Sequence, residues 1–469
     1  MGARLGLVGV LAAFTAVGPG CVGGGPLPTL EQQLGLAATA LANGKIEDAS
    51  ALVADARKWD PRHVDAARWS SLLADMYWRD EEAVRELKMA LRWARVMGLS
   101  AASESEPASD SDSDSDVPLP PPSLLSLDGD LPDALAFAER DASNLAALRG
   151  RLGELLFQAG RWGESSAPLL DGALGPLAER RRAFAMLASS LPFVRRFAGP
   201  LLTEQPLLRG ATPEFVCGIR GRLRPFAIDT GTSMTTVAAS FAEELGVRSR
   251  QLAGEALDGA GQRLAVEVGA LPQFRIGNVD IGAVPIMIVS DRALELRDLH
   301  GGPERVPRGV LGLDLLAACR LTIDPDRGSV VLELPQGLPR TESVQCLRVD
   351  GRCLVPVVVE GRRLWFVLDT GASHSSLSLR GLRDLSDGAT RATPSFRRVR
   401  TAGGGVMAVK EVRDLVIRCS DARFLHVTLP VVDRGDETVF PIHGVLGIDL
   451  LHRCLLTLDR GRLRLAARG

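Results

Sequence analysis

Residues 225–233 read Pro-Phe-Ala-Ile-Asp-Thr-Gly-Thr-Ser, and residues 364–373 read Leu-Trp-Phe-Val-Leu-Asp-Thr-Gly-Ala-Ser. Each stretch places the tripeptide Asp-Thr-Gly directly after a run of apolar residues. A second motif follows each of them at nearly the same separation. Residues 309–316 read Gly-Val-Leu-Gly-Leu-Asp-Leu-Leu, and residues 444–451 differ from them by one Ile in place of Leu. Two copies of both motifs on one register indicate an internal duplication rather than chance.

The chain around these motifs has the pattern of an all-β region. Short β-branched runs, such as residues 266–268, 284–289 and 355–359, are separated by Gly, Pro and Asp. Runs of this length between turn residues are typical of strands. The motifs divide the region into two halves, residues 207–335 and 343–467, and each half carries one copy of each motif.

The first part of the chain has a helical pattern. Ala and Leu recur at three- and four-residue spacing over residues 30–100 and again over residues 134–200. Residues 36–49 contain a helix, a Gly turn and the start of a second helix, which resembles a tetratricopeptide unit. Residues 148–170 repeat this pattern. A helical bundle without repeats is the alternative, and both give a multidomain α plus all-β fold class.

Residues 101–133 separate the two helical parts. Within them, residues 103–122 contain an alternation of Asp with Ser and then a Pro-rich run at 118–122. A segment of this composition buries too little apolar area to offset the entropy of ordering, so we expect a disordered linker. Weak calcium binding is the alternative.

The N-terminus has the features of an export signal. Arg4 precedes an apolar stretch over residues 5–17, and small residues lead to Cys21. Residues 1–20 therefore resemble a bacterial lipoprotein signal peptide, with Cys21 lipidated after cleavage. Gly18 departs from that pattern, because Leu is usual three residues before the Cys. A secretory signal without lipidation and a cytosolic chain with an apolar start are the alternatives.

Composition excludes several function classes. The chain has 469 residues, which is enough for about three domains, and a formal net charge of −2. A net charge this close to zero does not suit nucleic-acid binding, which needs a basic face. After the signal, the sequence lacks an apolar run of ~20 residues that could span a bilayer. We therefore expect contact with a membrane through the lipid anchor only.

The cysteines do not have the spacing of a metal site. Six cysteines follow Cys21, and none of them form the Cys-x-x-Cys pairs typical of zinc sites. Cys319 and Cys454 occupy equivalent positions in the two halves, which predicts that both are buried as small apolar residues. Disulfides are possible in an exported protein, but the sequence does not assign a pairing. We expect neither a metal nor an organic cofactor.

The two halves together resemble two fused retropepsin-like (retroviral-type) aspartic protease domains. The resemblance covers residues 207–467 and implies a single-chain, pepsin-like, two-lobed β-barrel arrangement. In that family each lobe contributes one Asp-Thr-Gly loop, and the downstream apolar-apolar-Gly segment runs beside it. The resemblance therefore implies a catalytic pair formed by Asp229 and Asp369, and a monomer.

Elementary chemistry explains why this pair would act together. Two carboxyls within hydrogen-bonding distance cannot both ionise, so they share one proton. One member can then take a proton from water while the other donates a hydrogen bond to the scissile carbonyl, without a covalent intermediate. Small Gly residues let the loops meet, and hydroxyls can brace them. The expected supporting residues are Thr230, Gly231, Ser233, Thr370, Gly371 and Ser373.

Each half also has a Gly-rich segment some thirty residues after its Asp. The resemblance implies that these segments are hairpins that close over a peptide substrate, and plain hairpin turns are the alternative. The expected hairpin tips are Gly259, Ala260, Gly261, Ala402, Gly403 and Gly404.

Other ionisable residues near the motifs have simpler explanations. His374 follows the second Asp-Thr-Gly and is expected to be an exposed loop residue, with a pH-responsive role as the alternative. Asp314 and Asp449 recur in the downstream motifs. We interpret both as carboxylates that bind turn or helix-end N–H groups, rather than as catalytic groups.

Two functions fit these observations. The first is an aspartic endopeptidase attached to a helical interaction module, acting on a peptide or protein and anchored at the periplasmic face of a bacterial envelope. The second is a non-catalytic peptide-binding adaptor, in which the helical repeats bind a protein partner. A duplicated β fold with incidental Asp-Thr-Gly turns is the remaining possibility.

Overall fold

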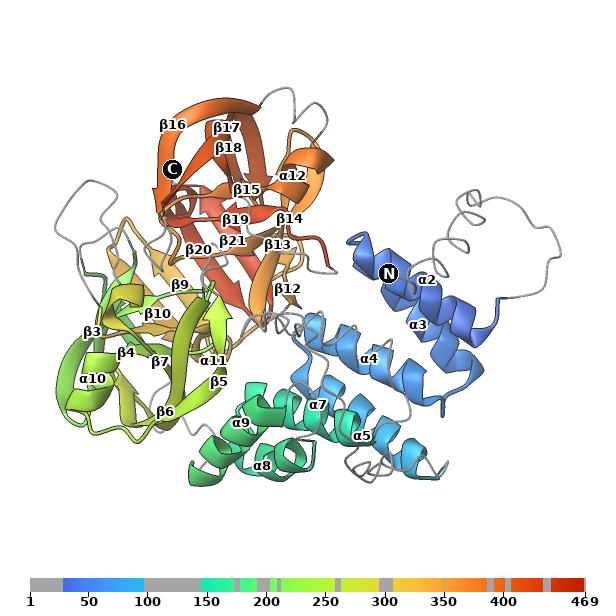
Figure 1. Ribbon diagram of the computed structural model, residues 1–469. Helices are drawn as coiled ribbons and strands as arrows, with labels where there is room; N and C mark the ends of the chain where they lie inside the picture. Colours follow the sequence, from blue (N-terminus) through green and yellow to red (C-terminus); the bar gives the residue numbers. More distant parts are fainter. Residues whose placement is uncertain are drawn as a thin grey trace, which may run out of the picture.

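The computed structural model has a helical N-terminal part followed by a β-rich part (Figure 1). The expected signal peptide with Cys21, and residues 101–133, lie outside the described residues. The structure describes residues 28–96, 145–172, 178–191, 203–208, 212–257, 263–294, 307–349, 351–385, 392–400, 406–432 and 440–467.

The helices pack side by side, and within residues 30–96 and 145–171 they follow one another through short turns. Gly44 (φ 71°) and Gly160 (φ 73°) occupy two of these turns in the left-handed region, which a residue without a Cβ atom adopts at little cost. None of the helices in the described part is both long and apolar enough to cross a bilayer. The helices are α2 (Leu30–Ala42), α3 (Ile46–Trp59), α4 (Val64–Met76), α5 (Asp80–Val96), α7 (Leu145–Gln158), α8 (Trp162–Asp171) and α9 (Ala178–Ser190).

The first β half is a seven-stranded sheet in the order β2-β3-β8-β4-β7-β6-β5, and β2 also pairs with β6 so that the sheet curls on itself. Its elements are β2 (Glu214–Ile219), β3 (Arg222–Ile228), β4 (Thr236–Ala238), α10 (Ala239–Glu244), β5 (Arg250–Leu257), β6 (Arg263–Ile276), β7 (Val279–Val289), η2 (Asp291–Leu294), β8 (Gly309–Leu311) and α11 (Leu313–Leu316).

The second β half repeats this plan, with an extra strand at one edge. The order is β12-β13-β14-β19-β15-β18-β17-β16, and β13 also pairs with β17. Its elements are β12 (Leu347–Val349), β13 (Arg352–Val359), β14 (Arg362–Leu368), β15 (Ser376–Ser378), α12 (Leu379–Asp384), β16 (Ala392–Arg400), β17 (Val406–Cys419), β18 (Ala422–Val432), β19 (Gly444–Leu446) and α14 (Ile448–Leu451).

A third sheet joins the two halves. Its order is β1-β10-β9-β20-β21-β11, so strands of the first half continue into strands of the second. The junction is antiparallel, and Thr322 of β9 faces Thr457 of β20. The strands are β1 (Thr203–Pro206), β9 (Arg320–Asp324), β10 (Ser329–Glu333), β11 (Val344–Gln345), β20 (Cys454–Asp459) and β21 (Arg462–Ala467).

The helices share apolar cores with the β halves. Trp69 and Met76 of α4 are buried in one cluster with Leu347, Trp365 and Val445 of the second half. At the other end of the helical part, α9 contacts β5 and β6 of the first half. Each large side chain buried in this way stabilises the folded state by about 1.5–3 kcal/mol. The helical part is therefore built onto the β part rather than tethered to it.

The equivalent cysteines differ in their surroundings. Cys454 is buried as expected, whereas Cys319 is half-buried. The prediction that both are fully buried was therefore wrong for Cys319. Cys319 lies in the bend just before β9, whereas Cys454 is the first residue of β20.

Candidate active site

The two Asp-Thr-Gly loops begin where two buried strands end. The apolar runs form β3 and β14, and Asp229 and Asp369 are the residues directly after them. Strands β8 and β19 run parallel to β3 and β14. The Asp229 N–H donates to the Leu311 carbonyl at 3.0 Å, and the Asp369 N–H donates to the Leu446 carbonyl at 3.1 Å. The downstream motifs thus run beside the loops, as the resemblance implies.

The threonines of the loops bind each other's strands. Thr230 Oγ1 donates to the Leu368 carbonyl at 2.8 Å, and Thr370 Oγ1 donates to the Ile228 carbonyl at 2.7 Å. Each hydroxyl also accepts from the opposite backbone, at 3.1 Å from the Thr230 N–H and 3.2 Å from the Thr370 N–H. Both threonines are fully buried. These four bonds fix the two loops against each other.

The carboxyl groups meet between the loops. Gly231 lies against the carboxyl of Asp369, and Gly371 lies against the carboxyl of Asp229. The Gly231 N–H donates to Asp229 Oδ1 at 2.8 Å, and the Gly371 N–H donates to Asp369 Oδ1 at 3.0 Å. The structure therefore brings together Asp229 and Asp369, which are 140 residues apart in the chain.

The surroundings of Asp229 favour its protonated form. Burial raises the pKa of Asp229 well above the usual carboxyl range, and the negative charge of Asp369 raises it further. Hydrogen bonds from Thr232 and Gly231 oppose this shift. Because two adjacent carboxylates repel, the pair keeps one proton under conditions in which isolated carboxyls would be ionised.

Asp314 and Asp449 hold the chain behind each loop. Asp314 Oδ1 accepts from the backbone N–H of Thr235 at 2.9 Å and from its hydroxyl at 2.8 Å. Asp449 Oδ1 accepts from the N–H of Ser375 at 2.8 Å and from its hydroxyl at 2.7 Å. Both carboxylates therefore bind N–H groups of the turns, which is the role expected for them.

Thr235 and Ser375 are part of the site that sequence reasoning missed. Their hydroxyls also accept from the N–H groups of Gly312 and Gly447, at 3.3 and 2.9 Å. Each hydroxyl thus links its loop to the downstream motif. The sequence signal that could have identified them is a hydroxyl residue at the same offset after Asp229 and after Asp369.

Ser233, Ser373 and His374 flank the two loops. The hydroxyl that reaches Asp229 belongs to Thr232, at 2.9 Å from Oδ2. Ser233 instead accepts at its backbone carbonyl from the Asp314 N–H at 3.1 Å. Ser373 is half-buried beside its loop, and His374 is half-buried rather than exposed.

The expected hairpin tips, residues 258–262 and 401–405, lie outside the described residues. The strands that flank them are paired antiparallel, with Leu257 facing Arg263 in the first half. In the second half, Arg400 faces Val406. Both Gly-rich segments therefore connect the two strands of a hairpin.

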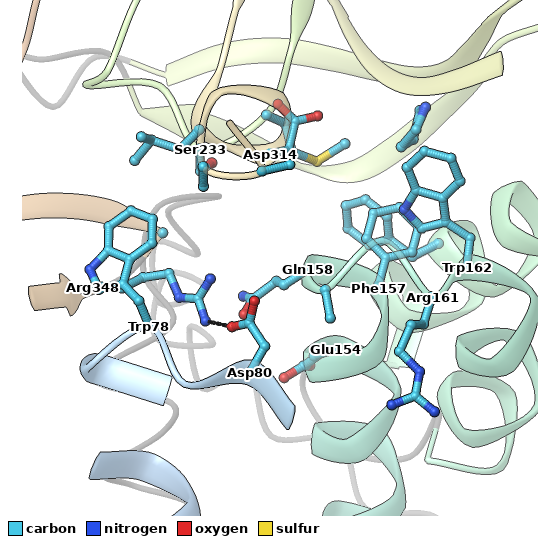
Figure 2. Close-up of a pocket in the computed structure, with 18 of the residues that line it drawn as sticks. Trp78, Asp80, Glu154, Phe157, Gln158, Arg161, Trp162, Ser233, Asp314 and Arg348 are labelled. Atoms are coloured by element: carbon cyan, nitrogen blue, oxygen red, sulfur yellow. Dashed lines mark hydrogen bonds and ion pairs between the residues drawn. The ribbon is translucent and has the colours of Figure 1, made fainter. Parts of the chain in front are cut away.

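A separate cleft of about 850 Å³ lies between the helices and the β part. Figure 2 shows Ser233 and Asp314 on one side of it, and Phe157 and Gln158 of α7 on the other. The cleft thus reaches the back of the first Asp-Thr-Gly loop. Asp229 and Asp369 are not among its lining residues.

A charged cluster beside this cleft connects the helices with the second β half. Arg348 of β12 pairs with Asp75 at 2.6 Å and with Asp80, as Figure 2 shows for Asp80. Arg151 of α7 binds the other oxygen of Asp75 at 2.9 Å. The guanidinium of Arg348 also lies over the Trp78 ring, with its Cζ 5.2 Å from the ring centroid, which is within the range of a cation–π contact.

Within the described ranges, His, Cys, Asp and Glu side chains do not gather into a group of three or more that could hold a metal ion. The donors around the carboxyl pair are N–H and O–H groups.

Part of the chain is similar to a known protein family. The curated proteins contain no match to this chain. Among solved structures, basic 7S globulin from soybean is 11% identical, with 58% of this chain and 97% of that chain covered and a TM-score of 0.33. A retropepsin-like aspartic protease from Rickettsia conorii is 16% identical, with 29% of this chain and 94% of that chain covered and a TM-score of 0.21. The aspartyl protease family model matches residues 216–315 and again residues 355–450. The β-rich part of this chain is therefore similar, twice over, to the aspartyl protease family domain.

Proposed function

We propose that the protein is an aspartic endopeptidase that hydrolyses peptide bonds with a water molecule activated by Asp229 and Asp369. The observation that carries this proposal is the reciprocal bracing of the loops by Thr230 and Thr370, which holds the two carboxyls side by side. A duplicated fold with incidental Asp-Thr-Gly turns would not require the turns to meet. Two intact loops in contact are what a shared proton requires.

The reaction needs one ionised and one protonated carboxyl. The ionised member takes a proton from water, and the water oxygen attacks the scissile carbonyl carbon. The protonated member hydrogen-bonds to the carbonyl oxygen and stabilises the charge that develops there. Because water attacks directly, the enzyme forms no covalent intermediate. The raised pKa of Asp229 keeps the required proton in the site.

The proposal includes a pepsin-like, two-lobed arrangement within one chain. Its support is the third sheet, in which β9 and β20 join the halves through paired backbone groups. Since each half supplies one carboxyl, the chain would not need to dimerise, and we propose a monomer. Analytical ultracentrifugation of the purified protein tests this part of the proposal.

The substrate would be a peptide or an unfolded protein segment. The two hairpins formed by β5 with β6 and by β16 with β17 are the elements that would cover it. An extended peptide can pair with hairpin backbone through N–H and C=O groups, whatever its side chains. Mapping the ends of the cleavage products would reveal any preference in the adjoining side-chain pockets.

The helical part is proposed to be tetratricopeptide-like. Its support is the succession of short helices joined by turns at Gly44 and Gly160. Helix pairs of this kind stack and leave a face for a partner. We propose that the face not packed on the β part binds a protein partner, which pull-down with a variant in exposed helix residues would test.

We also propose that the chain is an exported lipoprotein anchored through Cys21. The support is the order of Arg4, the apolar stretch and Cys21 in the sequence. Expression of the full chain in a bacterium, followed by separation of membrane and soluble fractions, tests this. Wild type is expected in the membrane fraction, and Cys21→Ser is expected to leave it. Equal distribution of the two would refute the anchor.

Proteolysis of an unfolded protein mixture by the full chain, from pH 3 to 8, tests the catalytic proposal. Asp229→Asn and Asp369→Asn are each expected to abolish cleavage, because half of the pair then cannot exchange a proton. Asp421→Asn is the matched control, since Asp421 is exposed in the turn between β17 and β18. This control is expected to cleave as wild type does.

The outcomes separate the candidate functions. Undiminished cleavage by either dyad variant would refute the proposed mechanism. A folded wild-type protein that binds peptides but cleaves none of them would favour the non-catalytic peptide-binding function. Thermal unfolding of each variant shows whether lost activity reflects lost structure.

A further inference from the structure

The two carboxyls of the pair receive different kinds of hydrogen bond. Residue 232 in the first loop is Thr, and its equivalent in the second loop is Ala372. The Thr232 hydroxyl donates to Asp229 Oδ2 at 2.9 Å, whereas the Thr232 N–H donates to the Asp229 backbone carbonyl at 3.4 Å. In the second loop the Ala372 N–H itself donates to Asp369 Oδ1, at 2.7 Å.

These differences give each carboxyl a preferred protonation state. Asp369 accepts two backbone N–H groups on Oδ1, from Gly371 and Ala372. A backbone N–H can only donate, so both bonds favour the ionised carboxylate. Asp229 accepts a single N–H, from Gly231, and its second donor is a hydroxyl. A hydroxyl rotates and can either donate to a carboxylate or accept from a carboxylic acid.

We propose that the shared proton resides on Asp229, that Asp369 is the general base, and that Thr232 is the positioning residue that makes this distribution possible. The catalytic meaning of this inference rests on the proposed function, whereas the location of the proton does not. Among the charged groups around Asp229, Asp369 does most to raise the pKa of the Asp229 carboxyl. The burial that raises the pKa of Asp229 acts in the same direction.

The assignment gives a balanced reaction. Water adds its oxygen to the carbonyl carbon and one proton to Asp369, while Asp229 passes its proton to the carbonyl oxygen, which produces a gem-diol. When the carbon–nitrogen bond breaks, Asp369 gives its proton to the leaving nitrogen and Asp229 regains one from the diol. Both residues return to their starting states, and the products are a carboxylic acid and an amine.

The pH profile of kcat/KM for Thr232→Val tests the role of Thr232. The acid limb would report ionisation of Asp369, which the Thr232 hydroxyl does not contact. The alkaline limb would report loss of the proton from Asp229, when the hydroxyl must donate to the new carboxylate. A hydrogen bond to an ionised group is roughly twice as strong as a neutral one, so losing it raises the alkaline limb by about 0.5–1 pH unit.

Thr232→Ser is the matched control, because it keeps the hydroxyl, and both limbs are expected to stay in place. Movement of the acid limb in Thr232→Val would assign the base to Asp229 and overturn the proposal. Two unmoved limbs would also overturn it, since Thr232 would then have no influence on the pair.

A second measurement does not depend on activity. Selective ¹³C labelling of aspartate carboxyls allows the pair to be titrated by NMR, with Asp229→Asn and Asp369→Asn identifying the two signals. We expect the Asp229 signal to be the one that keeps its proton beyond the usual carboxyl range. A proton kept by Asp369 instead would overturn the inference even in an active enzyme. The expected result in a protein that cleaves nothing would refute the proposed function and leave the inference standing.

Discussion

The carboxyl group of Asp369 occupies the space that a side chain on Gly231 would need. A Cβ atom added to Gly231 would lie 2.6 Å from Asp369 Oδ2. The relationship is reciprocal, because a Cβ atom on Gly371 would lie 2.5 Å from the Asp229 Cγ. Each glycine therefore makes room for the carboxyl group of the opposite loop, and the pair can approach only because both side chains are absent.

Gly231→Ala is expected to lower kcat/KM by about 100-fold or more, because the Asp369 carboxyl must move by a sizeable fraction of an ångström. Cleavage of a peptide substrate by the full chain measures this. Gly35→Ala is the matched control, since Gly35 is exposed in α2 and a Cβ there meets no atom within 4 Å beyond its own helix. Equal activity of both variants and wild type would contradict the close approach.

Thr370→Val is expected to destabilise the protein by about 2–4 kcal/mol. The change removes a hydroxyl that donates to the Ile228 carbonyl and accepts from the Thr230 N–H, so two buried groups lose their partner. Thr370→Ser retains the hydroxyl and is expected to lose far less. Denaturant unfolding compares the three proteins. A Thr370→Val protein as stable as Thr370→Ser would show that the reciprocal bonds contribute little.

Stability is expected to fall as pH rises above the normal carboxyl range. The pKa of Asp229 is raised on folding, so the folded protein binds more protons than the unfolded chain between the two pKa values. Asp229→Asn cannot ionise and should be more stable than wild type at neutral pH, by about 1–3 kcal/mol. The stability difference between Asp229→Asn and wild type should shrink at pH values below the pKa that the Asp229 carboxyl has in the unfolded chain. Thermal unfolding across pH measures it, and a constant difference would oppose the assignment.

Trp69→Ala is expected to destabilise the protein by about 3–5 kcal/mol. Trp69 is 3% exposed in the core that α4 shares with the second β half. Trp59→Ala is the matched control, because Trp59 is 50% exposed at the end of α3. Since Ala372 packs against the same core, Trp69→Ala should also reduce activity. Equal melting temperatures for Trp69→Ala and Trp59→Ala would show that the helices are dispensable for the stability of the β part.

Arg348→Met is expected to cost about 3–5 kcal/mol, because it leaves Asp75 with one of its two arginine partners. The Asp75 and Arg348 side chains are each at most 10% exposed, so little water can replace the lost charge. Arg363→Met breaks an exposed pair with Glu47 and should cost less than about 1 kcal/mol. Similar melting temperatures for both variants would mean that water reaches Asp75.

Much of the site could be predicted because its signals are local. The Asp-Thr-Gly tripeptides and their downstream motifs identified two β halves and the pair Asp229 and Asp369, and the family comparison confirms the two repeats. The helical N-terminal region was also confirmed. The tetratricopeptide character, the lipid anchor and the closing hairpins remain predictions. The residue whose hydroxyl reaches Asp229 was not predicted, because it is Thr232, which the sequence did not single out among the supporting residues.

The sequence by itself determined which residues recur and which strands lead to them, because apolar periodicity and Gly turns act over a few residues. Tertiary structure alone decided which atoms meet. Packing across 140 residues sets Thr230 against Thr370, and the exact turn of each loop aims the Ala372 N–H at a carboxylate and the Thr232 N–H at a carbonyl. Hydrogen bonds and burial depend on the directions of groups and on the positions of atoms to within a fraction of an ångström. Residue types alone do not encode these positions and directions.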